Sequence, residues 1–377
     1  MDKHTMIVWG VPASQPRLCG LPLAEHAPRA AQAHWGEVVQ AGQEAEALAL
    51  LCGLEADYAL LLPADMPLLL PETARALLEA LHRDGCAAAL CGRAAVAFQV
   101  EALRALTARR AQGFAGVEEA LDALSQSGQD LRELAPAQPD ELLRVTNPAS
   151  LAKAMQALRA RSCAALMEAG VVLIDPQATY VDVAVQVGEG TVIYPGNVLE
   201  GATRIGARCT LLPNNRMLDA LVDDDVTLEA SVLLEAQVGA HTTVGPYAYL
   251  RPGTRIGAHC RVGDFVEIKN SVIGEHTKVS HLTYVGDSDL GKDINLGCGV
   301  VFVNYDGKKK HRTKVGDHAF IGCNVNLVSP VEVGHDAYVA AGSTVTADVP
   351  PEALCVARGR QVVKEGWVAA RRETGKL

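Results

Sequence analysis

Short apolar runs alternate with helical patterns over the first 150 residues. Residues 6–9 and 58–62 are continuously apolar, as in strands that are buried on both faces. Residues 71–81 and 100–106 carry apolar side chains at helical spacing, and Glu72 suits a first helical turn. This alternation of strands and helices predicts an α/β domain with a mostly parallel sheet.

A helix is predicted from about Pro148 to Glu168. Asn147 is a suitable N-cap, Pro148 fits the first helical position, and Gly170 follows the end. We interpret residues 148–169 as a connecting helix between a first domain, residues 1–147, and a second domain, residues 170–377.

From residue 171 an aliphatic residue followed by glycine recurs along the chain. Aliphatic residues fall six apart from 238 to 268 and again from 315 to 333. A sustained period of six is typical of a hexapeptide parallel β-helix, in which stacked coils share one aliphatic core. Two polar stretches, 214–225 and 304–312, break this register of six, and a polar loop that projects from a rigid β-helix often carries binding chemistry.

Composition narrows the class of protein. Hydrophobic residues make up 49% of the 377 residues and aromatic ones only 4%, so the core must be built from small aliphatic side chains. A net charge of −10 argues against a nucleic-acid partner. Because no apolar run approaches eighteen residues and no leader pattern opens the chain, we expect a cytoplasmic protein with no membrane partner.

Lysines and cysteines add two further constraints. The first 150 residues contain 19 acidic and 11 basic side chains, and Lys3 is their only lysine, which is unusual for a domain that binds triphosphate. The ten cysteines are scattered and form no C-x-x-C pair, which favours buried thiols over disulfides or zinc ligands.

Five motifs in the second half closely resemble the acetyltransferase domain of the bifunctional bacterial GlmU family. They are R-P-G at 251–253, V-G-D-F-V-E-I-K-N at 262–270, H-L-T-Y-V-G-D at 281–287, N-Y-D-G at 304–307 and K-E-G-W at 364–367. The resemblance runs from about residue 147 to 367. It implies a left-handed β-helix, a homotrimer, and acetyl transfer from acetyl-CoA to the amine of glucosamine-1-phosphate, which supplies UDP-N-acetylglucosamine synthesis.

The resemblance also implies roles for individual residues. His281 matches the general base, a task that suits an imidazole because it titrates near neutral pH. The expected sugar-phosphate ligands are Arg251 and Lys269, with further contacts from Tyr284, Asn295, Asn304, Tyr305 and Lys310. The expected coenzyme contacts are Cys298, Cys323, Ala341, Arg358 and Lys364, where the family usually has Ala and Ser in place of the two cysteines.

The first domain matches the family's uridyltransferase domain less well. The glycine-rich phosphate loop carries Pro12 and Ser14, the usual arginine is Pro16, and the usual lysine is Leu23. Proline removes the backbone donor and the freedom that such a loop needs. Gln40 matches a uracil contact and Asp65 a metal ligand, with Thr146 or Asn147 as its partner. We predict a shortened, inactive uridyltransferase-like domain, with Mg²⁺ at Asp65 only if activity survives.

Three alternatives remain open. The chain could keep both activities, or it could be a non-catalytic trimeric scaffold that binds a sugar nucleotide. A scaffold has no use for a base such as His281. A zinc lyase on the same β-helix would need three imidazoles that meet between subunits, for which five histidines are available: His259, His281, His311, His318 and His335.

Overall fold

The computed structural model describes residues 2–11 and 16–376, and these form two units. Unit 1 comprises Met1–Leu166 and Tyr180–Val185, and unit 2 comprises Met167–Thr179 and Gln186–Leu377. Pro12 and Ser14 of the predicted phosphate loop lie outside the described residues. Among the helices in the described part of the chain, none combines the length and the apolar character needed to span a bilayer.

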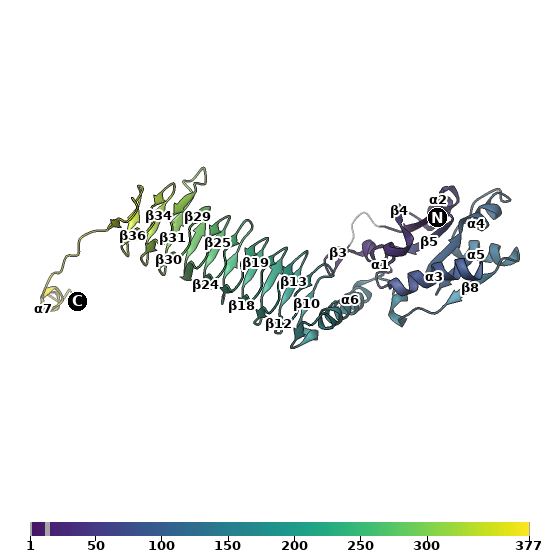
Figure 1. Ribbon diagram of the computed structural model, residues 1–377, viewed down its shortest axis with the longest axis horizontal. Coiled ribbons are helices and arrows are strands. Elements are labelled where there is room, and N and C mark those ends of the chain that lie inside the picture. Colours follow the sequence, from purple (N-terminus) through teal and green to yellow (C-terminus); the bar gives the residue numbers. More distant parts are fainter. Residues whose placement is uncertain (1, 12–15, 377) are drawn as a thin grey trace. The chain divides into compact units, whose positions relative to one another are not determined.

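Unit 1 is an α/β domain around one six-stranded sheet (Figure 1). The strand order is β4-β1-β5-β7-β6-β8, and only β7 runs antiparallel to its neighbours. The sheet strands are β1 (His4–Trp9), β4 (Glu37–Ala41), β5 (Tyr58–Pro63), β6 (Ala88–Cys91), β7 (Ala95–Gln99) and β8 (Leu131–Leu134). The helices are α1 (His26–Trp35), α2 (Glu44–Gly53), α3 (Pro71–Asp84), α4 (Val100–Thr107), α5 (Val117–Gln126) and α6 (Pro148–Glu168). Short elements are β2 (Arg17–Leu18), β3 (Leu21–Pro22), η1 (Leu23–Glu25), η2 (Pro139–Leu142) and β10 (Tyr180–Val181).

Successive residues of β1 face two different cores. Met6 and Val8 pack with residues of α1 and α3, whereas Ile7 packs with residues of α2, α4 and α5. Both faces of the sheet are therefore covered by helices, which explains the continuously apolar runs at 6–9 and 58–62. The predicted strands and helices of this region are confirmed.

The start of α6 follows its sequence signals. The side-chain oxygen of Asn147 accepts a hydrogen bond from the backbone N–H of Ser150 at 3.0 Å, and Pro148 opens the helix. Ala154 and Leu158 of α6 pack in a small core with Leu18 and Leu23. The predicted N-cap is confirmed.

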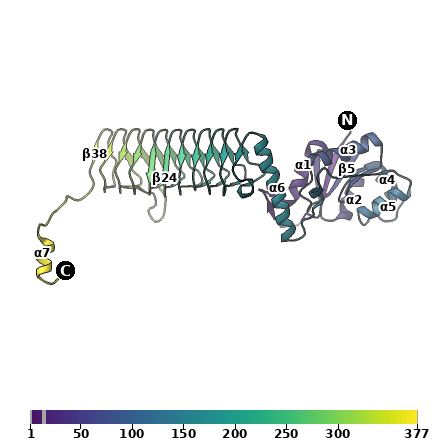
Figure 2. The same cartoon turned by 90° about the horizontal axis from the view of Figure 1, so that it is seen from below.

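Unit 2 is a parallel β-helix with three faces, each a ladder of short strands (Figures 1 and 2). Face 1 contains β13 (Val198–Glu200), β16 (Arg216–Leu218), β19 (Val232–Leu234), β22 (Tyr249–Leu250), β25 (Glu267–Lys269), β28 (Tyr284–Gly286), β31 (Val301–Val303), β34 (Asn326–Val328) and β37 (Thr344–Val345). Face 2 contains β11 (Gln186–Val187), β14 (Arg204–Ile205), β17 (Leu221–Val222), β20 (Gln237–Val238), β23 (Arg255–Ile256), β26 (Val272–Ile273), β29 (Ser288–Leu290), β32 (Thr313–Val315) and β35 (Glu332–Val333). Face 3 contains β9 (Val172–Leu173), β12 (Val192–Ile193), β15 (Thr210–Leu211), β18 (Thr227–Leu228), β21 (Thr243–Val244), β24 (Arg261–Asp264), β27 (Lys278–His281), β30 (Asn295–Leu296), β33 (Phe320–Ile321), β36 (Tyr338–Val339) and β38 (Leu354–Cys355). Unit 2 also contains η3 (Pro176–Ala178) and, after the last coil, α7 (Trp367–Glu373).

The period of six residues corresponds to one strand and one corner of each coil. Ile256, Val262 and Ile268 lie on three successive faces, and at most 4% of each is exposed, so together they fill the axis of one coil. The predicted fold class, an α/β domain followed by a left-handed β-helix of hexapeptide repeats, is confirmed.

The predicted break in the register of six at 214–225 is confirmed, and it shortens a coil without opening a projecting loop. β16 and β17 lie in this stretch and pair with the coils on both sides. Val198 pairs with Arg216, and Arg216 with Val232, so one coil is two residues shorter than its neighbour. The corners absorb this difference, and the strands stay in register.

The stretch 304–312 does leave the coil. Val301 pairs with Asn326 on the next coil, 25 residues later, and the additional residues project as a loop (Figures 1 and 2). This predicted excursion is confirmed.

Candidate active site

The predicted base and three of the predicted coenzyme contacts lie in one column where the strands of face 3 end. Asp264 of β24 is directly opposite His281 of β27. On the next coils, Leu296 is opposite Ile321, and Ile321 is opposite Val339. Each of these residues is followed two positions later by a predicted coenzyme contact: Cys298, Cys323 and Ala341. Backbone bonds link the column, because Asn324 N–H donates to the carbonyl of Cys298 and Gly342 N–H to that of Cys323, both at 2.8 Å. We call residues 264, 281, 298, 323 and 341 the base column.

His281 is oriented by a carboxylate. Its Nδ1 lies 2.6 Å from Oδ1 of Asp264, and a charged carboxylate accepts, so Nδ1 carries the proton and Nε2 keeps its lone pair. The hydrogen bond from His281 holds the pKa of Asp264 below its ordinary value. About half of the His281 side chain is exposed (53%), so Nε2 is available to a ligand. Asp264 was not predicted as a site residue, although the coil length places it next to His281.

Three cations gather on face 1 and at the loop. Lys269 is opposite Gly286, and Arg251 N–H bonds to the carbonyl of Ile268, so Arg251 lies on the coil that precedes Lys269. Arg251 Nη1 donates to Glu267 at 2.7 Å, which raises the pKa of Arg251. Lys310, from the projecting loop, lies close enough to lower the pKa of Lys269, with a further contribution from desolvation. Such a group of cations suits a phosphate dianion.

The side chains of Tyr284 and Asn304 both approach Gly286. A Cβ atom at Gly286 would lie 2.6 Å from Nδ2 of Asn304 and would also meet the Tyr284 hydroxyl. The amide of Asn304 donates to Asp287 at 2.5 Å, and Asp287 also accepts from Asn270 at 2.6 Å. Asn304 is buried, so this network fixes its position. Because Gly286 has no side chain, the Tyr284 hydroxyl and the Asn304 amide are not covered at this point and can contact a ligand next to the cations.

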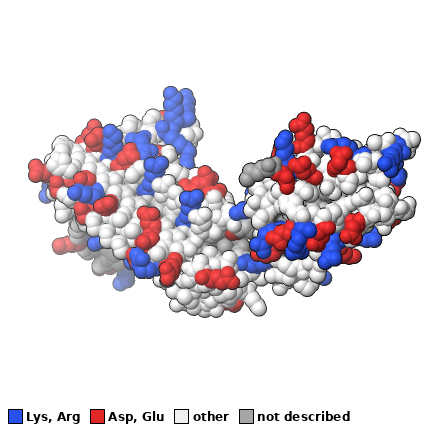
Figure 3. Space-filling view, turned by 45° about the vertical axis from the view of Figure 1, so that its right-hand side comes forward, with Lys and Arg blue, Asp and Glu red and all other residues white. Residues whose placement is uncertain are grey.

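The projecting loop is held by its own side chains. The carboxylate of Asp306 accepts from the backbone N–H groups of Lys308 and Lys309 and from the ring of His311, each at 2.7 Å. These bonds hold the pKa of Asp306 well below its ordinary value, the Lys309 amide contributing most. Arg312 anchors the base of the loop through Asp289, with Nε 2.6 Å from Oδ2. Lysine and arginine side chains project together from unit 2 in Figure 3, and the loop supplies Lys308, Lys309, Lys310 and Arg312.

The remaining predicted residues are less closely grouped. Asn295 is opposite Lys278 on face 3, and Tyr305 is exposed, its hydroxyl bonded to the carbonyl of Gly307 at 2.8 Å. Arg358 passes beside Gly342, next to the upper end of the base column. Lys364 lies in the exposed segment before α7, and no described contact joins it to the base column.

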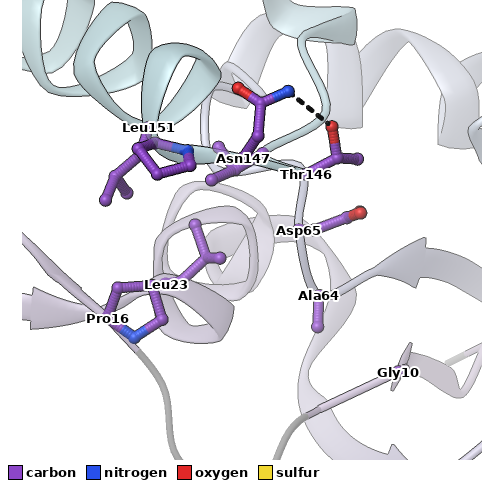
Figure 4. Close-up of a pocket in the computed structure, with 10 residues that line it drawn as sticks. Gly10, Pro16, Leu23, Ala64, Asp65, Thr146, Asn147 and Leu151 are labelled. Atoms are coloured by element: carbon purple, nitrogen blue, oxygen red, sulfur yellow. Dashed lines mark hydrogen bonds between the residues drawn. The ribbon is translucent and has the colours of Figure 1, made fainter.

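A cavity of about 340 Å³ in unit 1 occupies the place of the predicted nucleotide site (Figure 4). Its lining is mostly apolar and comprises Gly10, Pro16, Leu23, Ala64, Asp65, Val145, Thr146, Asn147, Pro148 and Leu151. Among these described residues, none is a lysine or an arginine that could bind a triphosphate.

The residues at Asp65 do not fit a magnesium ion. The carboxylate of Asp65 forms an ion pair with Arg144, whose guanidinium lies 5.7 Å from the ring centroid of Trp9. The side-chain oxygen of Asn147, one of the two expected partner ligands, is occupied as the N-cap of α6. A guanidinium therefore neutralises the carboxylate where a cation would bind.

Comparison with known proteins agrees with the repeat. Residues 235–270 and 312–347 match the model of the family described as bacterial transferase hexapeptide (six repeats). The chain is 48% identical over 269 residues to the bifunctional protein GlmU of Clostridium beijerinckii (strain ATCC 51743 / NCIMB 8052), covering 71% of this chain and 59% of the relative. It is 53% identical over 233 residues to that of Clostridium novyi (strain NT), covering 62% and 51%. The resemblance to GlmU is confirmed, and the chain spans less than two thirds of the length of these curated relatives.

Likenesses to solved structures are weaker. A 2-C-methyl-D-erythritol 4-phosphate cytidylyltransferase from Thermus thermophilus aligns with 41% of this chain and 99% of its own, at 15% identity and a TM-score of 0.34. A UDP-N-acetylglucosamine acyltransferase from Francisella novicida aligns with 49% of this chain and 67% of its own, at 18% identity and a TM-score of 0.35. At these scores the fold assignment rests on the strand ladders themselves.

Proposed function

We propose that this protein transfers an acetyl group from acetyl-CoA to the amine of glucosamine-1-phosphate. The observation that carries the proposal is the base column, which aligns His281 with Cys298, Cys323 and Ala341 on successive coils. Coils are about 4.8 Å apart, so the predicted coenzyme contacts extend over roughly 14 Å from the base. This geometry supports a coenzyme that lies along the column with its thioester near His281.

The phosphate of the acceptor is proposed to bind Arg251, Lys269 and Lys310. Tyr284 and Asn304 would then contact the sugar, with Asn295 and Tyr305 as additional ligands. The chemistry supports a phosphomonoester, because a guanidinium fork and two ammonium groups match its charge and its acceptor oxygens.

The reaction follows from the tautomer of His281. Nε2 removes a proton from the sugar ammonium, and the freed nitrogen attacks the thioester carbonyl. The C–N bond forms and the C–S bond breaks. The nitrogen loses two protons in all: the one held on Nε2 passes to the departing thiolate, and the second leaves to solvent as the tetrahedral adduct collapses to the amide. Asp264 stabilises the imidazolium that forms between these two transfers.

Two parts of the site are proposed to come from other copies of the chain. Within one chain, no described contact joins Lys364 to the base column. Arg358 lies beside Gly342, next to Ala341 at one end of that column. A homotrimer, in which tails and loops of neighbouring copies complete each site, would supply both cations to the coenzyme phosphates.

Unit 1 is proposed to be inactive in uridyl transfer. The ion pair of Asp65 with Arg144 and the apolar lining of the adjacent cavity both support this. Two alternatives, a bifunctional enzyme and a non-catalytic scaffold, are outcomes of the experiment that follows.

The test supplies the purified chain with acetyl-CoA, glucosamine-1-phosphate, UTP and Mg²⁺, and follows both products by mass spectrometry. We expect N-acetylglucosamine-1-phosphate and no UDP-sugar. UDP-N-acetylglucosamine would show that unit 1 is active, and the absence of both products would favour the scaffold. His281→Ala should abolish acetyl transfer without changing the oligomer, whereas His276→Ala, another exposed histidine of the β-helix, should retain it.

A further inference from the structure

A cluster of potential metal ligands lies in unit 1 and shares no residue with either site described above. Asp2, His4 and His82 bring three ligand atoms within 4.8 Å of one another, and they are the only such group among the residues that the structure describes. His4 begins β1, and His82 lies in the last turn of α3. Nε2 of His82 is 3.7 Å from a carboxylate oxygen of Asp2.

The ring of His4 is already oriented as a metal ligand would be. Its Nδ1 lies 3.2 Å from the carbonyl of His34, so Nδ1 carries the proton and donates to that oxygen. A ligating histidine usually donates its second ring nitrogen to a carbonyl or carboxylate, which fixes the tautomer and the orientation of the ring.

The other nitrogen of His4 has no partner. Nε2 is buried and forms no hydrogen bond among the described residues. A buried acceptor without a partner is rare in folded proteins, and an ion or water is the usual explanation. The ring is enclosed by Trp35, Tyr58 and His82, with centroids 6.1, 5.8 and 5.4 Å away, so the buried Nε2 is shielded from bulk solvent.

We propose that His4, His82 and Asp2 bind a divalent transition-metal ion such as Zn²⁺. Two imidazoles and a carboxylate form a ligand set that Zn²⁺ accepts. With bonds of about 2.1 Å, tetrahedral ligand atoms are about 3.4 Å apart, so small side-chain rotations of Asp2 and His82 close the site. Both are partly exposed, at 60% and 37%, and are free to make them.

The metal would join two elements that are distant in sequence. It would fasten the start of β1 to the end of α3 and leave a fourth coordination position open to solvent or to an exchangeable ligand. The site is independent of acetyl transfer, so binding can be measured without reference to activity.

Titration of the full chain with Co²⁺, followed by d–d absorption, tests the proposal. We expect one tetrahedral Co²⁺ per chain, displaced by Zn²⁺, and a metal-dependent rise in the unfolding temperature of the wild type. His4→Gln and His82→Gln should each weaken binding by more than about tenfold. Since His82 lies at the surface, its variant keeps the fold and remains informative if His4→Gln unfolds.

His276→Gln is the matched control, because His241, His259 and His276 stack along one corner of the β-helix at 4.7 and 4.9 Å and could also attract metal. Binding that this variant abolishes, or that survives in both His4→Gln and His82→Gln, would overturn the proposal. A chain that binds no Co²⁺ would overturn it as well.

Discussion

Replacement of Gly286 by alanine would place a methyl group between the side chains of Tyr284 and Asn304. The added carbon would lie 2.6 Å from Nδ2 of Asn304, whereas ordinary contact begins near 3.4 Å. Asn304 would therefore have to retreat by about 0.8 Å. Because its amide is buried and bonded to Asp287, it cannot do so without losing that bond.

The expected loss follows from this displacement. A misplacement of about 1 Å in a positioning residue costs about 100-fold in rate, so kcat/KM for glucosamine-1-phosphate should fall by roughly that factor in Gly286→Ala. Loss of the buried hydrogen bond should lower the free energy of unfolding by about 1–3 kcal/mol. We expect the stacked coils to remain folded after a loss of this size. The backbone at Gly286 needs no positive φ, so the substitution acts through space rather than through strain.

The assay is the mass-spectrometric measurement of N-acetylglucosamine-1-phosphate at several acceptor concentrations. Thiol reagents are avoided because the chain has ten cysteines. Gly53→Ala is the control, since a Cβ at the end of α2 has nothing within 4 Å. A folded Gly286→Ala protein with wild-type kcat/KM would refute the placement of the acceptor beside Tyr284 and Asn304.

Three further predictions concern the base, the phosphate ligands and the core. Asp264→Asn should lower kcat by about 10- to 100-fold with little change in KM, because the carboxylate that stabilises the imidazolium is lost; an unchanged kcat would exclude a role for Asp264. Lys310→Gln should raise KM about tenfold at neutral pH, through loss of one charged contact. It should also move the alkaline limb of kcat/KM to higher pH, since Lys310 no longer lowers the pKa of Lys269, while Lys309→Gln should change neither. Phe302→Ala, at a fully buried position, should destabilise the coil by about 3–5 kcal/mol in urea unfolding, and a smaller loss would mean that the cavity collapses.

The β-helix was predictable because its order is local. Most coils contain sixteen to eighteen residues, or about three repeats of six. A residue therefore pairs with one about three repeats away, and the period of six predicts the register of the strands. The break in the period at 214–225 is local in the same way, because the corners absorb two missing residues and the strands stay paired. Asp264 could have been found by counting one coil back from His281.

Contacts in unit 1 could not be predicted in this way. Arg144 meets Asp65 across 79 positions, and His4 meets His82 only because β1 and α3 pack together. No repeat relates these residues, so their meeting depends on the topology of the whole sheet. Pro16 and Leu23, which stand where the resemblance would place an arginine and a lysine, do line the cavity beside Asp65.

Each residue of the base column belongs to a different coil. The distances between these residues along the helix axis can therefore change only in steps of one coil. Residues added or removed at a corner, as near 214–225 or 304–312, leave the axial position of every strand unchanged. Only the gain or loss of an entire coil moves His281 relative to Cys298, Cys323 and Ala341, and then by about 4.8 Å at once. Under the proposed function, finer adjustment to a longer or shorter acyl group is therefore confined to side chains within a coil, such as the cysteines at 298 and 323.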